Sequence, residues 1–280
     1  MPIFRLAERW KKMMNGEADI HLMRMVYISN VWLLKDQQGR RFLIDTGDAT
    51  ERLALQYSLH LLEIANPGDL TAVLLTHRHR DHAGNAAWLR RRYQCPVICH
   101  PADAPFLEGL ARPRPLAVQP MALLHKALCT IEDHRPARCL VDDTYHLGKW
   151  RWGFEVYPVP GHTEGSVMLY HRPTAALFSG DAIITGIPPF RFFDHLRLAV
   201  PEYSPEVERC HESVRKFLED PPEIKYLCAG HGPMVSKEVN ARLQALAAPP
   251  ATTAEKLKQA VEKGISLLPD FMEKKVSGWL

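Results

Sequence analysis

Short apolar runs, bounded by turn-forming or charged residues, recur along the chain up to about residue 230. Runs of this length between turn signals are typical of buried strands. We expect strands at 41–44, 72–75, 96–99, 154–159, 175–178 and 224–228. Other segments repeat apolar residues three and four positions apart, which is the spacing of one face of a helix. We expect helices at 50–64, 83–93, 204–218, 236–247 and 252–267.

Three of the expected strands end in the same way, with a glycine followed by one side chain that can bind a metal. The strand at 154–159 leads to Gly161 and His162, the strand at 175–178 to Gly180 and Asp181, and the strand at 224–228 to Gly230 and His231. Glycine lets the backbone turn sharply and approach a bound ion closely. The repeated pattern predicts one shared site at the strand ends.

Residues 76–82, Thr-His-Arg-His-Arg-Asp-His, place three imidazoles and a carboxylate on the loop between the expected strand 72–75 and helix 83–93. His77 and His79 lie two residues apart and can converge on one ion, whereas Asp81 and His82 continue round the turn and can face a second. Neutral imidazole and carboxylate suit zinc, and they also suit iron or manganese. The loop therefore predicts a metal site with room for two ions.

Composition narrows the class of protein. The 280 residues are 46% hydrophobic and 24% charged, which is ordinary for a globular protein, and a net charge of +3 argues against a nucleic-acid partner. No stretch reaches the roughly 20 apolar residues of a membrane helix, and the N-terminus lacks the pattern of a secretory signal. Six scattered cysteines suit reduced thiols. We expect a cytoplasmic protein with a small-molecule substrate and no membrane partner.

We expect one domain over 1–280, with a core at about 20–240 and a helical C-terminal extension at about 236–280. That extension either packs on the core or forms a homodimer contact. Two other segments, 101–143 and 183–203, either wall the active-site cleft or pack against the protein itself or a partner subunit. The second carries an apolar and basic run that could cover a substrate. Its candidate contact residues are Phe190, Arg191 and Phe192.

The histidine and aspartate pattern described above resembles that of the metallo-beta-lactamase-fold metallohydrolases, and the resemblance covers about residues 20–240. The resemblance implies an α/β (α+β) fold, a four-layer αββα sandwich of two mixed sheets flanked by helices, with metals at one edge. By that similarity two metal ions are bound, most simply zinc, with iron and manganese as alternatives. The signature reads here as Asp45-Thr46-Gly47, His77-x-His79-x-Asp81-His82, His162, Asp181 and His231.

The resemblance also assigns roles. His77, His79 and His162 would hold the first ion, and Asp81, His82 and His231 the second, with Asp181 bridging them. A metal-bridging hydroxide would be the nucleophile, and Asp81 would take up and return a proton while remaining a ligand. Asp45 would fix the tautomer of a ligand histidine, and we expect Thr163 to do similar work beside His162.

Departures from individual subfamilies bear on the substrate. True beta-lactamases of this fold do not use aspartate at the bridging position, which argues against antibiotic hydrolysis as the main function. Quorum-signal lactonases place a tyrosine shortly after the bridge, and residues 181–185 contain none. Glyoxalase II enzymes resemble the chain around His162 and Asp181, although their cysteine-containing glycine loop is missing. The favoured reaction is hydrolysis of a carboxylic ester, thioester or lactone, with phosphodiesters second.

Two further readings remain open. Persulfide dioxygenases share the His-x-His-x-Asp-His run but bind a single iron, and such an enzyme would be an oxidoreductase. A regulatory protein that keeps the metals but turns over slowly would also carry the full ligand set. Metal stoichiometry distinguishes a mononuclear dioxygenase from a dinuclear hydrolase. A broad substrate panel distinguishes a slow regulatory protein from an active hydrolase.

Overall fold

The protein is described from a computed structural model, in which residues 19–23, 26–112, 138–186 and 196–247 are placed well enough to discuss. The chain divides into two compact units, 1–247 and 248–280. All described residues belong to the first unit, so the expected helix at 252–267 lies outside them. The description below concerns the first unit alone.

The first sheet contains six strands in the order of the sequence, β1-β2-β3-β4-β5-β6. Strands β1 to β3 are antiparallel neighbours, and β3 to β6 run parallel to one another. A tight turn at residues 36–40 joins β2 to β3, with the amide of Asp36 donating to the carbonyl oxygen of Arg40 at 3.0 Å. The strands are β1 (Asp19–Leu22), β2 (Trp32–Lys35), β3 (Arg41–Ile44), β4 (Ala72–Leu74), β5 (Val97–Cys99) and β6 (Asp143–Thr144).

The second sheet has the order β13-β10-β9-β8-β7, and only its β10 and β13 pair is parallel. A separate two-stranded ladder joins β11 to β12. The strands are β7 (Gly148–Lys149), β8 (Phe154–Pro158), β9 (Val167–His171), β10 (Ala176–Gly180), β11 (Ile183–Ile184), β12 (Arg197–Leu198) and β13 (Tyr226–Ala229).

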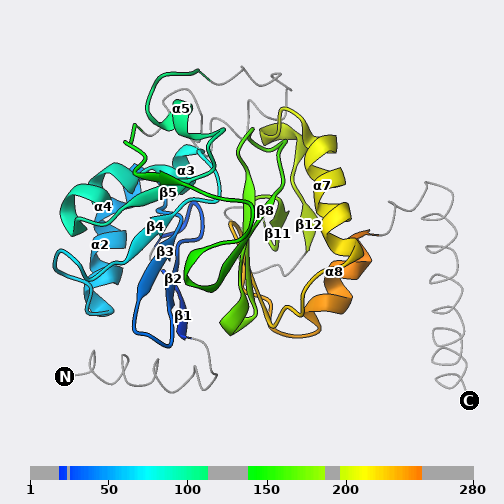
Figure 1. The fold of residues 1–280 in the computed structure, drawn as a ribbon, viewed down its shortest axis with the longest axis horizontal. Helices are drawn as coiled ribbons and strands as arrows, with labels where there is room; N and C mark the ends of the chain where they lie inside the picture. The colour runs from blue at the N-terminus through cyan, green and yellow to red at the C-terminus, as the bar shows by residue number, and fades with distance from the viewer. Residues whose placement is uncertain (1–18, 24–25, 113–137, 187–195, 248–280) are drawn as a thin grey trace, which may run out of the picture. The chain divides into compact units, whose positions relative to one another are not determined.

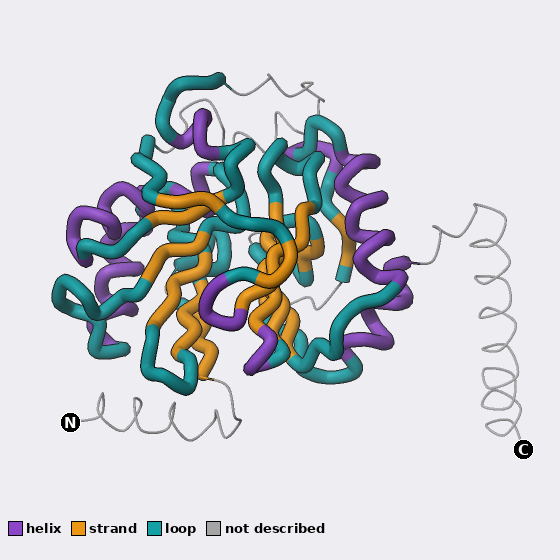
Figure 2. Tube along the Cα trace, in the orientation of Figure 1, coloured by secondary structure: helices purple, strands orange, loops and turns teal. Residues whose placement is uncertain are grey.

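Helices cover the outer face of each sheet, as Figures 1 and 2 show. The first sheet carries η1 (Ala49–Glu51), α2 (Arg52–Leu61), α3 (Arg80–Ala83), α4 (Ala86–Tyr93) and α5 (Ala104–Leu107) in its connections. The second carries η2 (Arg151–Gly153), η3 (Arg172–Thr174), η4 (Pro201–Tyr203), α7 (Val207–Glu219) and α8 (Val239–Ala247).

Alternation along the strands divides the buried side chains into three layers. Leu43 and Val73 point to a core shared with α2 and α4, whereas their neighbours Phe42 and Leu74 point to a core between the two sheets. On the second sheet, Leu177 points outward to a third core that includes residues of α7 and α8. Because successive strand residues face opposite sides, each sheet buries both faces. The αββα sandwich is therefore confirmed.

The helix expected at 83–93 begins at Ala86, and a separate short helix, α3, precedes it in the segment expected to be a loop. The chain turns at Gly84, where a Cβ atom would lie 2.5 Å from the carbonyl oxygen of Arg80 and 2.6 Å from the amide nitrogen of Ala49. Next to it, the buried amide of Asn85 donates to the carbonyl oxygens of Thr46 and Asp48 at 2.9 and 2.8 Å. A continuous helix is excluded because this corner packs directly against the loop that follows β3.

The remaining helix boundaries also shifted slightly. The segment expected to be helical at 50–64 forms η1 and then α2, which ends at Leu61, and α7 begins at Val207 rather than at 204. In the described ranges, the longest helices are too short and too polar to cross a bilayer.

Candidate metal centre

The candidate ligands emerge from the ends of strands in both sheets. The loop after β4 carries His77 and His79, and α3, which follows it, carries Asp81 and His82. The loop after β8 carries His162, whereas Asp181 and His231 follow β10 and β13. Since β10 and β13 are parallel, their carboxyl ends place these two side chains at the same edge. A backbone hydrogen bond also links the two sheets here: the amide of Val167 in β9 donates to the carbonyl oxygen of Thr76, which follows β4, at 2.9 Å.

The seven side chains gather into groups whose candidate ligand atoms all lie within 4.8 Å of one another. One group, called here the three-histidine group, comprises His77, His79 and His162. A second, the aspartate group, comprises Asp81, His82 and His231, and a third set joins His77 and His82 to Asp181. The structure thus brings together all seven residues that the sequence singled out.

Asp181 lies between the two groups. Its Oδ1 is 3.3 Å from Nε2 of His82, and its Oδ2 is 3.4 Å from Nε2 of His162 and 3.2 Å from Nε2 of His231. Asp81 approaches Nε2 of both His82 and His231 at 3.5 Å. One carboxylate therefore contacts histidines of both groups.

Glycine is required beside this carboxylate. A Cβ atom on Gly230 would lie 2.2 Å from Oδ1 of Asp181 and 2.8 Å from Cε1 of His82. Gly180 has a φ of +51°, and its Cβ would lie 2.7 Å from the hydroxyl of Thr76. The expectation that glycines at the strand ends allow close approach to the site is confirmed at these two positions.

Several polar atoms point into the centre without a hydrogen-bond partner. They are buried, and burying such atoms unsatisfied is costly. Nε2 of His77, His82 and His162, together with Oδ1 of Asp181, are in this state. Imidazole nitrogens and carboxylate oxygens are also the donors that zinc and iron accept. On both counts the residues fit a metal centre.

Charge is distributed unevenly between the two groups. Burial, together with the neighbouring histidines, lowers the pKa of His77 well below its usual range, and burial followed by the effect of His79 also lowers the pKa of His162. Burial acts to lower the pKa of His82 and His231 as well, but Asp181 and other carboxylates outweigh it. They raise the pKa of His82 well above its usual range and that of His231 to about 9. The three-histidine group is thus rich in neutral imidazole.

The two carboxylates show the reciprocal effect. Burial acts to raise the pKa of Asp81 and Asp181, but the neighbouring histidines hold both well below the usual range. The carboxylates are therefore ionised and compensated by His82 and His231. A bound cation would replace the protons on these imidazoles as the compensating charge.

Asp45 contacts His82 directly and reaches His77 through the hydroxyl of Thr76. Its Oδ2 lies 2.8 Å from Nδ1 of His82 and accepts from the hydroxyl of Thr76 at 2.8 Å, and Thr76 in turn lies 3.0 Å from Nδ1 of His77. Its Oδ1 accepts from the amide of Thr76 at 2.8 Å. This is the contact that the sequence analysis expected between Asp45 and a ligand histidine.

The expected contact between Thr163 and His162 is wrong. Nδ1 of His162 lies 2.9 Å from the hydroxyl of Ser204, whereas the hydroxyl of Thr163 donates to Asp103 at 2.8 Å. The sequence analysis expected a helix to begin at Ser204, but α7 begins three residues later, and the hydroxyl of Ser204 contacts the histidine. The hydroxyl of Thr163 also lies 2.8 Å from that of Ser166, so neither of these partners is His162.

Three other observations complete the comparison with the sequence. Phe190, Arg191 and Phe192, the candidate substrate contacts, lie outside the described residues. The sequence analysis missed Arg78 and Asp103, which are buried directly behind the histidines. No local signal marks Asp103, because it lies 25 residues beyond Arg78 and acts through the fold.

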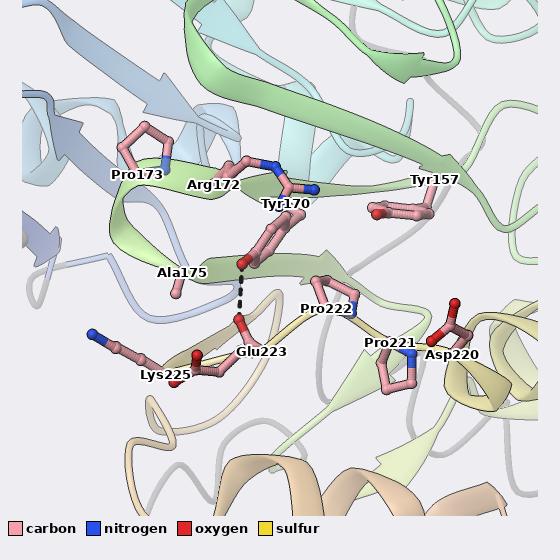
Figure 3. Close-up of a pocket in the computed structure, with 10 residues that line it drawn as sticks. All are labelled: Tyr157, Tyr170, Arg172, Pro173, Ala175, Asp220, Pro221, Pro222, Glu223 and Lys225. Carbon is pink, nitrogen blue, oxygen red and sulfur yellow. Dashed lines mark hydrogen bonds between the residues drawn. The ribbon is translucent and has the colours of Figure 1, made fainter.

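A separate cavity of about 530 Å³ is lined in part by residues of β8 and β9, such as Tyr157 and Tyr170 (Figure 3). None of the seven candidate ligands is in its lining. In its lining, the hydroxyl of Tyr170 donates to the carbonyl oxygen of Glu223 at 2.8 Å, and Arg172 is paired with Glu155. Nothing about it resembles the ligand-rich centre.

Comparison with known proteins supports the same assignment. Residues 24–231 match the family model of the metallo-beta-lactamase superfamily. The probable metallo-hydrolase YflN of Bacillus subtilis (strain 168) is 30% identical over 193 residues, which cover 64% of this chain and 70% of that protein. The hydroxyacylglutathione hydrolase of Enterobacter sp. (strain 638) is 29% identical over 156 residues, covering 56% of this chain and 47% of the enzyme.

Two solved structures are similar to the chain in overall fold. TTHA1623 in a di-iron-bound form is 28% identical, with a TM-score of 0.53 over 77% of this chain and 93% of that one. The BLEG-1 B3 metallo-beta-lactamase has a TM-score of 0.54 over 83% of this chain and 98% of its own, at 23% identity. The second likeness concerns the fold alone.

Proposed function

The chain belongs to the metallo-beta-lactamase superfamily and is a metal-dependent hydrolase, and we propose that it holds two divalent metal ions and hydrolyses a small-molecule ester, thioester or lactone. The observation that carries the proposal is the position of Asp181. Its two carboxylate oxygens lie within 3.4 Å of histidines in both ligand groups. A carboxylate placed in this way suits a pair of ions that share one ligand.

In this proposal His77, His79 and His162 hold one ion, and Asp81, His82 and His231 hold the other. Such ions, when bound, supply an acidified water molecule as nucleophile and polarise the substrate carbonyl. The chain itself supplies orientation, since Asp45 and Ser204 hold the far nitrogens of His82 and His162. Asp81 is buried and close to both histidines of its group, so it can accept and return a proton within the site.

The relatives support the class of bond. Hydroxyacylglutathione hydrolases from several bacteria are 26% to 29% identical to the chain over about half of their own length. We propose a thioester, ester or lactone on this basis, with phosphodiesters as the second class. Zinc is the ion that we propose, and the similarity to a di-iron protein makes iron the alternative to compare with it.

Elemental analysis of protein purified without added metal is the first test. About two ions per chain, with turnover of a thioester, ester or lactone in a substrate panel, is the expected result. About one iron per chain, with oxygen uptake in the presence of glutathione persulfide, would overturn the hydrolase in favour of an oxygenase. Full occupancy without turnover of any panel member would favour a slow or regulatory protein.

Replacing the shared carboxylate tests the site within the same assay. We expect Asp181→Ala to lower the metal content and abolish turnover, because both groups lose a common ligand. Asp36→Ala is the matched control: it removes another largely buried carboxylate, which accepts from the amides of Gln38 and Arg40 in the turn at the opposite end of β3. Equal loss of metal from both variants would contradict the assignment.

A further inference from the structure

An arginine is buried between two of the metal-binding histidines. Arg78 stands between His77 and His79 in the sequence, and only 2% of its surface is exposed. Its guanidinium lies 4.1 Å from the centre of the Phe106 ring, and its Nη1 contacts both Asp103, at 3.0 Å, and Glu164. Burying an unpaired arginine would destabilise the fold, so Asp103 and Glu164 compensate the charge of Arg78.

Asp103 is the centre of this arrangement. It is completely buried and accepts from four donors on two loops. From the loop of His77 and His79 it receives the amide of Arg78 at 2.9 Å and the guanidinium at 3.0 Å. From the loop of His162 it receives the hydroxyl of Thr163 at 2.8 Å and the amide of Gly165 at 2.9 Å.

The two loops are also closely packed at this carboxylate. A Cβ atom on Gly165 would lie 2.6 Å from Cγ of Asp103 and 2.8 Å from its Cβ. There is consequently no space for the loop of His162 to move toward Asp103. Backbone and side-chain bonds to one carboxylate thus fix the distance between the segments that carry all three members of the three-histidine group.

The aspartate group is held by different residues. Ser29 donates to the carbonyl oxygen of Asp81, and the amide of Asn30 donates to the carbonyl oxygen of Gly230 at 2.6 Å. Thr46 donates to the carbonyl oxygen of His82 through its hydroxyl at 2.8 Å. None of these bonds involves Asp103 or Arg78.

We propose that Asp103, with Arg78 and Thr163, positions the three-histidine group and does not position the aspartate group, in contrast to Asp45, which reaches His82 directly and His77 through Thr76. This inference rests on the proposed metal centre. It predicts that weakening the Asp103 contacts lowers the affinity for one ion and leaves the other nearly unchanged. Partners that orient metal ligands typically change metal affinity by about 10- to 100-fold when they are removed.

The experiment is a titration of the metal-free protein with cobalt(II), followed by calorimetry and by visible absorption. Reference variants His79→Ala and His231→Ala identify which binding phase and which spectrum belong to each group. Thermal unfolding of every metal-free variant checks that the chain is folded before metal is added.

Two variants weaken the Asp103 contacts in different ways. In Asp103→Asn, the side-chain NH2 replaces a carboxylate oxygen and cannot accept from the donors that face it. In Thr163→Val, the hydrogen bond from the hydroxyl to Asp103 is lost with little change in side-chain shape. We expect both to weaken the phase assigned by His79→Ala by about 10- to 100-fold, with the other phase within about threefold of the native value. Thr163→Ser keeps the hydroxyl and should restore native binding.

Thr174→Val is the control for general damage. It removes another buried threonine hydroxyl, which lies 2.9 Å from Nδ1 of His171 and contacts no candidate ligand. Native affinity in both phases is expected for this variant.

Equal weakening of both phases in Thr163→Val, or native binding in both Thr163→Val and Asp103→Asn, would overturn the positioning role. A native protein that binds only one cobalt ion would instead refute the dinuclear proposal. In that case the positioning role is tested on the single remaining binding phase: weakening in Thr163→Val supports it, and native affinity contradicts it.

Discussion

Replacing Asp45 by asparagine should weaken metal binding by His82, one of the candidate ligands, because it reverses the hydrogen bond to the ring. Ionised aspartate only accepts hydrogen bonds, so the Asp45 contact at 2.8 Å keeps the proton of His82 on Nδ1 and leaves Nε2 free to coordinate. The same carboxylate accepts from Thr76, whose hydroxyl lies beside Nδ1 of His77. One carboxylate therefore orients a histidine of each ligand group.

Asparagine reverses this preference. Because Oδ1 of Asp45 must still accept from the amide of Thr76, the new amide group faces His82 and donates to its Nδ1. The proton of the ring then moves to Nε2, which is the nitrogen that points to the ion. We expect metal affinity to fall by about 10- to 100-fold, or about 1.4 to 2.7 kcal/mol.

The backbone does not confound this substitution. Asp45 has a φ of +59°, and asparagine is among the residues that adopt this left-handed conformation most readily. The two side chains also have nearly the same shape, so the packing of this buried position is retained. The change is therefore confined to one hydrogen-bonding group.

Competition with a chromogenic chelator measures the affinity for each ion. Asp36→Asn is the matched control, since it makes the same chemical change in a largely buried carboxylate of the β2–β3 turn. It should unfold at lower temperature with native metal affinity. The tautomer argument is refuted if Asp45→Asn binds both ions as tightly as the native protein, or if Asp36→Asn loses the same affinity.

Three further outcomes follow from the structure. Gly230→Ala places a Cβ atom 2.2 Å from Oδ1 of Asp181, so elemental analysis should find the metal content of this variant well below native. Ser204→Ala removes the partner of Nδ1 of His162 and should weaken one ion by about 10-fold in the chelator competition. Burial lowers the pKa of His171 to about 4 from an ordinary 6.5, so the folded state resists a proton that the unfolded state accepts. The contribution of neutral His171 to the free energy of unfolding is therefore fully present above about pH 6.5. It is lost as the pH falls toward 4, by up to about 3 kcal/mol. In urea unfolding of the chelated protein, His171→Gln should lack this part of the pH dependence.

The fold was predictable where each element is specified locally. The runs at 41–44 and 72–75 have buried residues on both faces, and both form strands of the first sheet. The break between α3 and α4, at Gly84 and Asn85, was not predictable in the same way. Gly84 packs closely against Ala49, which lies 35 residues earlier, and the pattern of apolar residues carries no information about that contact.

The grouping of the candidate ligands was predictable for a related reason. Each candidate lies at most eight residues after the end of a strand, and strands that end at one edge of a sandwich bring such residues together. Residues that support the ligands have no such constraint. Asp103 contacts the loops that carry the histidines, and Ser204 contacts the ring of His162, both from connections far away in the sequence. Their residue types are also common in turns and helix caps.

The orientation of Thr163 illustrates why adjacency in sequence is a poor guide to support. A side chain next to a ligand shares its backbone but not its direction, and here the hydroxyl points to Asp103 while the ring of His162 points to Asp181. Support must come from the side of the ring opposite to the ion, since Nδ1 and Nε2 face apart. The residues that meet this geometric requirement are set by packing between the loops, so they can be identified only once the loops have been placed.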